Sequence, residues 1–171
     1  MYARLSSAPC VHVAPLPSRC LVAVEGSREK HRFVIGTCDV HPVNQVQLLE
    51  YSEERNKLEV IASFQHPSQV HRLISSKTDE ALLVSSSSGR EGNELSLLKL
   101  PEEKLSTSTS EQEFSLDPID FDRKTVLSSS NEQGSLISAV QWHPKKANLL
   151  LTLSRRKLSV CSIGAESFKV S

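Results

Sequence analysis

Two segments of the chain carry the same order of strand-like runs. In residues 69–100 a first run leads through a turn with Asp79-Glu80 into an apolar run, then through a longer turn into a third. Residues 136–163 repeat this order with a tighter last turn. Runs of this length separated by Ser, Gly, Asn and Pro predict antiparallel strands. The repeat therefore predicts several copies of one small sheet.

Further runs extend the pattern on both sides. The sequence shows little helical periodicity. It also lacks the alternation of helix and strand that would favour a parallel sheet. The strand-like runs are 20–26, 31–38, 44–52, 57–67, 69–76, 80–88, 94–101, 124–130, 134–144, 148–155 and 157–163.

Together the runs predict an all-β chain of antiparallel four-stranded units. A repeat of four antiparallel strands is the blade of a β-propeller, so we expect residues 1–171 to form about two to three blades of an incomplete propeller. In a blade the middle strands pack on both faces, as "ALLV" (81–84) and "NLLLTL" (148–153) suggest. The first strand lines the central channel, and the last strand is outermost.

Residues 102–123 interrupt the pattern. They are rich in Ser, Thr and acids, and we interpret most of them as a flexible surface loop. Five residues there are candidates for burial: Leu105, Phe114, Leu116, Ile119 and Phe121. Ser108 and Ser110 each precede an acid by three positions (Glu111 and Glu113), as acid-directed kinases favour. A solvated loop without a regulatory role is the preferred interpretation.

The charge balance limits the class of partner. Lys plus Arg and Asp plus Glu each number 20, so net charge gives no argument for nucleic acid or an anionic membrane. The basic run at 154–157 is short and is interpreted as a solvated turn. No apolar run approaches the roughly 20 residues that span a bilayer. The four scattered cysteines indicate reduced thiols in a cytosolic protein: Cys10, Cys20, Cys38 and Cys161.

Candidate catalytic and metal-binding residues do not form a recognisable set, so we assign no catalytic, cofactor or metal residue. The six histidines are interpreted as turn and channel-lining residues: His12, His31, His41, His66, His71 and His143. "SSSS" (85–88) is interpreted as a strand end running into a flexible turn, with no nucleophile elbow. Gly89 and Gly92 fit a turn between strands rather than a phosphate loop.

Trp142-His143-Pro144 is the remaining candidate site. Because "QVHRLISS" (69–76) has Ser75 where Trp142 stands in the repeat, we interpret Trp142 as a packing residue between this blade and the next. His143-Pro144 would open the following turn.

Several segments resemble one family. The first is an Arg-Phe-hydrophobic-hydrophobic-Gly-Thr strand at Arg32–Thr37, followed by an Asn-Gln pair (Asn44–Gln45) that enters the next strand. An acidic turn at Ser52–Arg55, a His-containing segment at Phe64–His71 and a hydrophobic-x-Trp-x-Pro strand end at Val140–Pro144 come after them. This order of features is similar to the WD-repeat family of proteins that interact with the endosome-associated recycling and Golgi-associated retrograde tethering complexes.

The resemblance covers roughly residues 30–163, and it implies a seven-bladed propeller without catalytic activity or cofactor. It implies a cytoplasmic scaffold at the trans-Golgi network and endosomes that supports endosomal recycling and retrograde transport. The alternatives are an adaptor of another system, such as chromatin or a ubiquitin ligase, and, third, an enzyme. The chain departs from the family where a Trp-Asp dipeptide is usual, with Cys161-Ser162 and Leu98-Lys99 instead.

Two to three blades cannot close a ring, so the resemblance implies an N-terminal piece or truncated form of a longer propeller. We then expect an exposed apolar patch on residues 148–163 and a partly exposed Trp142.

Overall fold

The chain folds into three four-stranded antiparallel sheets that follow one another along the sequence. The computed structural model describes residues 9–40, 43–89, 92–106, 122–128, 137–163 and 168–170. In each sheet the spatial order of the strands is their order in the chain. The first sheet holds β1 Ser18–Ala23, β2 His31–Thr37, β3 Asn44–Ser52 and β4 Lys57–His66. The second holds β5 Gln69–Ser75, β6 Leu82–Gly89, β7 Gly92–Lys99 and β8 Asp122–Ser128. The third holds β9 Ile137–Trp142, β10 Leu149–Ser154, β11 Lys157–Ile163 and β12 Phe168–Val170.

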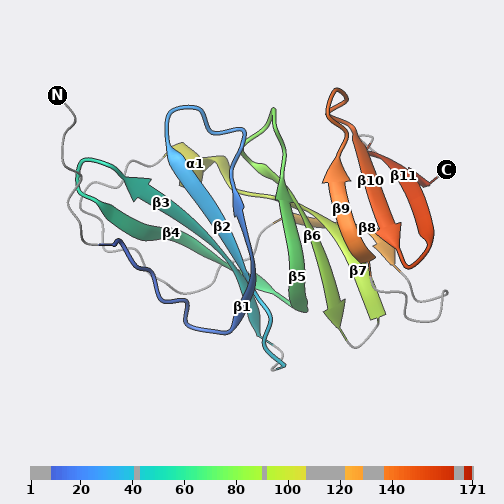
Figure 1. Cartoon of the computed structure of the whole chain (residues 1–171), viewed down its shortest axis with the longest axis horizontal. Coiled ribbons are helices and arrows are strands. Elements are labelled where there is room, and N and C mark those ends of the chain that lie inside the picture. Colours follow the sequence, from blue (N-terminus) through green and yellow to red (C-terminus); the bar gives the residue numbers. More distant parts are fainter. Residues whose placement is uncertain are drawn as a thin grey trace.

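The sheets stand side by side, and their first strands are neighbours (Figure 1). Strand β5 contacts β1 and β2 of the first sheet, and β9 of the third sheet contacts β5. The prediction of an all-β chain with repeated antiparallel sheets is thus confirmed. The arrangement is compatible with an incomplete, propeller-like fold. Strand β12 was not among the predicted strands.

The second sheet is buried on both faces. Successive residues of a strand point to opposite faces, so neighbours in β6 enter different cores. Leu83 packs in the cluster shared with the first sheet, and Val84 in the cluster shared with the third. Both side chains are fully buried. The expectation that a middle strand packs on both faces therefore holds for β6.

The interpretation of Ser85–Ser88 as the end of a strand is confirmed, and residues 90–91 of the turn that follows lie outside the described residues. Ser85, Ser86 and Ser87 lie inside β6 and are buried, and the strand continues to Gly89. Their pairing with β5 and β7 continues the ladder of the apolar half of the strand. Small side chains fit where a sheet has no solvent-facing side, and sequence polarity alone does not reveal this.

Helix α1, Glu102–Ser106, begins the segment that was interpreted as a loop. Leu105, one of the named candidates for burial, packs in the core shared by the first two sheets. Asp122 and Arg123 at the other end of the segment begin β8. Ser108, Ser110, Glu111 and Glu113 lie outside the described residues, as do Phe114, Leu116, Ile119 and Phe121. Across the described part of the chain, no helix is long and apolar enough to cross a membrane.

The outward face of the third sheet carries an apolar patch, as expected. Leu153, Leu158 and Val160 are exposed on β10 and β11. Leu153 pairs with Leu158, and Leu151 with Val160, so these side chains form cross-strand pairs on one face. The opposite face holds the buried residues Leu150 and Cys161.

Candidate functional site

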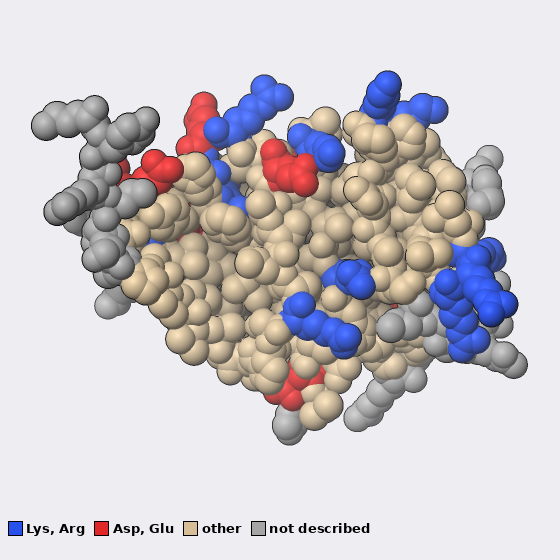
Figure 2. All heavy atoms as spheres, in the orientation of Figure 1, with Lys and Arg blue, Asp and Glu red and all other residues tan. Residues whose placement is uncertain are grey.

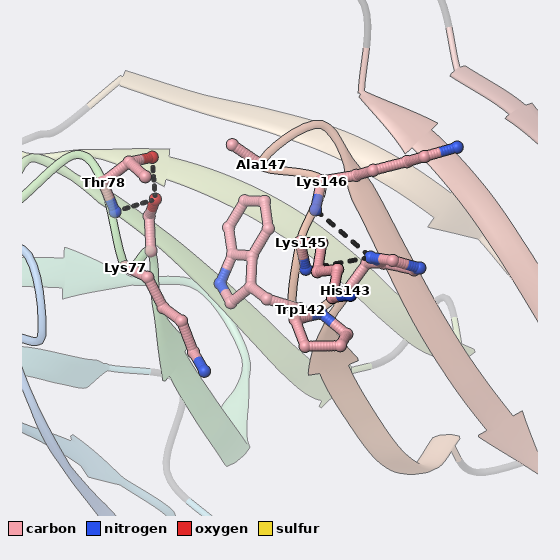
Figure 3. A pocket seen from close by; sticks show the side chains of 9 residues that line it. Lys77, Thr78, Trp142, His143, Lys145, Lys146 and Ala147 are labelled. Carbon is pink, nitrogen blue, oxygen red and sulfur yellow. Dashed lines mark hydrogen bonds between the residues drawn. The ribbon is translucent and has the colours of Figure 1, made fainter.

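A cleft lies between two turns at one end of the sheets. One turn joins β5 to β6, and the other joins β9 to β10 (Figure 3). The cleft has a volume of about 120 Å³. It is lined by Ser76, Lys77, Thr78, Trp142, His143, Pro144, Lys145, Lys146 and Ala147.

Equivalent hydrogen bonds close both turns. The N–H of Ser76 donates to the carbonyl of Leu82 over 2.9 Å, and the N–H of His143 donates to the carbonyl of Leu149 over 2.8 Å. Ser76 and His143 occupy the same place in the repeat, one residue after Ser75 and Trp142. The sequence repeat is therefore a repeat of backbone geometry.

A side chain also organises each turn. Ser76 Oγ accepts the N–H groups of Thr78 and Asp79, each over 3.3 Å. His143 Nδ1 accepts the N–H of Lys145 over 3.1 Å and the N–H of Lys146 over 3.2 Å. The interpretation of His143 as a residue that opens the turn is confirmed, because its ring holds the two N–H groups that follow.

Trp142 forms the floor between the two turns. Only 6% of the residue is exposed, and it packs with Val84 and Leu95 of the second sheet. The expectation of a partly exposed Trp142 was wrong, because its indole is buried against the preceding sheet and needs no following sheet to cover it. Trp142 is a packing residue, as predicted, but it packs against the preceding sheet and not against a following one.

The indole N–H of Trp142 is buried and has no hydrogen-bond partner within the described residues. A buried donor without an acceptor costs about 1–3 kcal/mol, and native structures leave few such groups. In Figure 3 the nitrogen edge of the indole faces the side on which Lys77 and Thr78 lie. The sequence predicted a packing role for this residue but gave no sign of its unpaired donor.

The rim of the cleft is basic. Lys77, Lys145 and Lys146 are all exposed. Figure 2 shows Lys and Arg side chains at the end of the molecule where the β9–β10 turn lies, and again beside the β10–β11 turn. The latter turn holds Arg155 and Arg156, both exposed, which confirms the interpretation of residues 154–157 as a solvated turn.

The histidines are dispersed over the molecule. His66 is buried, with Nε2 3.3 Å from Ser85 Oγ and Nδ1 2.8 Å from the carbonyl of Ser68. His31 Nε2 lies 3.0 Å from Glu53 on the surface. His41 lies outside the described residues. In the described ranges, no three His, Cys, Asp or Glu side chains are grouped to hold a metal ion.

One contact joins residues that sequence reasoning treated separately. His71 Nδ1 lies 3.6 Å from Cys38 Sγ, and His71 Nε2 lies 2.5 Å from Ser88 Oγ. Burial lowers the pKa of His71, and the charge of Arg19 adds to the effect. Cys38 and His71 meet because β2 ends beside β5, a pairing between sheets that local sequence does not show.

Gly89 and Gly92 face each other at the end of the β6–β7 hairpin. Gly92 has a φ of 113°, which favours glycine. The interpretation of these glycines as turn residues is confirmed.

Comparison with protein-family models finds no match to the chain, and comparison with curated proteins finds none.

Proposed function

We propose that this chain is a non-enzymatic interaction scaffold of the WD-repeat type. Its partners are the endosome-associated recycling and Golgi-associated retrograde tethering complexes. It acts on the cytoplasmic side of endosomes and the trans-Golgi network and supports endosomal recycling and retrograde transport. The order of features from Arg32 to Pro144 supports this proposal.

The observation that carries the proposal is the repetition of the turns on stacked sheets. Residues 76–82 and 143–149 close with the same backbone hydrogen bonds at the same end of neighbouring sheets. Turns held by a rigid sheet scaffold provide a defined surface for a protein partner. The two turns border a cleft with a basic rim, so this end of the molecule offers both shape and charge for recognition.

The proposal is tested by affinity capture from cell lysate with the full chain as bait, followed by quantitative mass spectrometry. We expect subunits of the tethering complexes to be enriched, and free purified chain to compete them away. Enrichment of histones or ubiquitin-ligase subunits in their place would contradict the proposal and favour an adaptor of another system.

The apolar patch on the third sheet requires a matched control, because such a patch can capture proteins without specificity. The bait with Leu158→Gln and Val160→Gln removes two exposed apolar side chains from that patch. Tethering subunits should remain enriched with this bait, while non-competed background proteins should fall.

A further inference from the structure

We propose that the cleft between residues 76–78 and 142–147 binds a carboxylate from an acidic segment of a protein partner, with the indole N–H of Trp142 donating to one carboxylate oxygen. This inference rests on the proposed scaffold function in one respect only, because it assumes that the partner is a protein. It does not depend on which complex supplies the segment.

The first step of the argument is the unpaired donor. Trp142 is more than nine-tenths buried, and its Nε1 has no partner among the described residues. The nitrogen faces the β5–β6 turn across the cleft (Figure 3). Since an indole N–H can only donate, the missing partner is an acceptor.

The second step is the sign of the charge around that donor. Lys77, Lys145 and Lys146 are exposed residues that line the cleft, and a lysine ammonium group can only donate. The end of the Lys146 side chain points away from the indole (Figure 3). The two acids that follow Lys77 make contacts elsewhere. Glu80 binds Arg32 over 3.1 Å, and Asp79 Oδ1 accepts the N–H of Ala81 over 2.9 Å. The cleft therefore favours an acceptor that carries negative charge.

The third step is size. A volume of about 120 Å³ lies well below the roughly 300 Å³ and more of small-molecule pockets. It accommodates one acidic side chain rather than a nucleotide or a sugar. A planar carboxylate needs one fixed donor and nearby cations, which the cleft supplies. A phosphate is better matched by the bidentate fork of arginine, and none of the described arginines lines the cleft.

Access to the donor requires a small movement. The indole nitrogen exposes less than 1 Å² in this structure. Lys77 lies on the nitrogen side of the indole and is exposed, so its flexible side chain can move aside for an incoming oxygen (Figure 3).

The test uses the fact that Trp142 is the only tryptophan of the chain. The full chain labelled with ¹⁵N gives one indole N–H signal in an NMR spectrum. It is titrated with the capped peptide Gly-Asp-Glu-Asp-Gly, with the neutral peptide Gly-Asn-Gln-Asn-Gly, and with sodium phosphate. We expect the acidic peptide alone to shift the indole signal saturably. An indole signal that stays unchanged would overturn the proposal, and it is the result expected if a bound water already accepts the indole N–H. So would an equal shift with the neutral peptide, or a shift with phosphate but not with the acidic peptide.

Variants assign the binding to this cleft. Calorimetry of Trp142→Phe, which keeps an aromatic ring but lacks the N–H, should show about tenfold weaker binding of the acidic peptide. The pair Lys145→Gln and Lys146→Gln changes only exposed side chains and should weaken binding about fivefold. The matched pair Arg155→Gln and Arg156→Gln removes the same charge at the β10–β11 turn and should leave binding unchanged.

Equal weakening by the lysine and arginine pairs would show a bulk charge effect and overturn the proposal, even if Trp142→Phe fails to fold. Peptide binding without capture of tethering complexes would reject the proposed partner and leave this inference standing. The reverse outcome would reject the inference alone.

Discussion

Arg32 Nη1 lies 3.1 Å from Glu80 Oε2, joining β2 of the first sheet to the β5–β6 turn of the second. The same guanidinium donates through Nε to Glu50 over 3.1 Å and through Nη2 to the carbonyl of Leu105 in helix α1. Arg32 is almost fully buried, whereas Glu80 is 39% exposed. One buried cation thus connects a strand, a turn and a helix that are far apart in the sequence.

Replacing Arg32 should destabilise the chain strongly. Removing one partner of a buried ion pair typically costs about 3–5 kcal/mol, and Arg32→Met removes the hydrogen bonds that Arg32 donates to Glu50 and to the carbonyl of Leu105. Because Glu50 keeps some solvent access and Lys30 nearby, we expect a loss of about 2–4 kcal/mol. Urea unfolding of the wild-type chain and the variant measures this loss in the free energy of unfolding.

Glu80→Gln is the matched control for Arg32→Met. Its carboxylate is partly exposed, so the loss should stay within about 1 kcal/mol. An Arg32→Met loss as small as that of Glu80→Gln would show that Arg32 does not connect the two sheets.

Close approach of the first two sheets depends on Gly36 in β2. A Cβ at this position would lie 2.6 Å from Cys20 Sγ and 2.6 Å from Val70 Cγ1. Gly36→Ala should therefore cost about 1–3 kcal/mol through overpacking. At Gly89 the nearest described side chain to a Cβ would be Ser68, with its rotatable Oγ at 2.7 Å, so Gly89→Ala should cost less. Thermal unfolding of the two variants compares them, and an equal loss in both would contradict the tight contact at Gly36.

The sequence predicted the structural roles of those residues whose pattern depends only on their neighbours along the chain. Alternation and turn residues gave the strands, and the repeat gave their grouping into sheets. Trp142 was identified as a packing residue because Ser75 holds the same place in another copy. Its burial against Val84 and Leu95, and its unpaired N–H, depend on which neighbouring sheet it meets.

Contacts between sheets carry no local signal. The Cys38–His71 contact and the burial of Ser85–Ser87 follow from packing of a strand against another sheet. Helix α1 lies in a stretch whose Ser, Thr and acidic composition predicts a loop, and burial of Leu105 against the first two sheets supports it there.

The thiol of Cys20 should make the free energy of unfolding depend on pH in the alkaline range. Burial raises its pKa from 9.0 to about 11, partly opposed by a backbone hydrogen bond with Gly36. The folded state disfavours the thiolate, so this contribution is fully present below pH 9.0 and is lost as the pH rises toward 11. Between pH 8 and 10 the loss should be about 1 kcal/mol.

Cys20→Ala isolates that contribution. Denaturant unfolding of both proteins over this pH range should show stabilities that converge as the pH rises, because the variant has no thiol to ionise at this position. Parallel pH profiles of the two proteins would contradict a raised pKa at Cys20.

The outward face of the third sheet should bind a hydrophobic dye and promote self-association. Leu158 is 64% exposed and Val160 is 39% exposed. Replacing both with Gln should lower ANS fluorescence and light scattering, while each surface change alters stability by only about 0.5 kcal/mol. Val11→Gln with Val13→Gln removes two apolar side chains that are more exposed and lie outside the sheets, and it should change neither signal. A wild-type chain that is monomeric and binds no dye would contradict the role of this face.

The most direct test of the central claim is binding between purified components. The purified full chain is immobilised and titrated with purified endosome-associated recycling complex or Golgi-associated retrograde complex in biolayer interferometry. The account predicts saturable binding with a micromolar or lower Kd that persists in the Leu158→Gln, Val160→Gln variant. No saturable binding of either complex to a chain shown to be folded would contradict it.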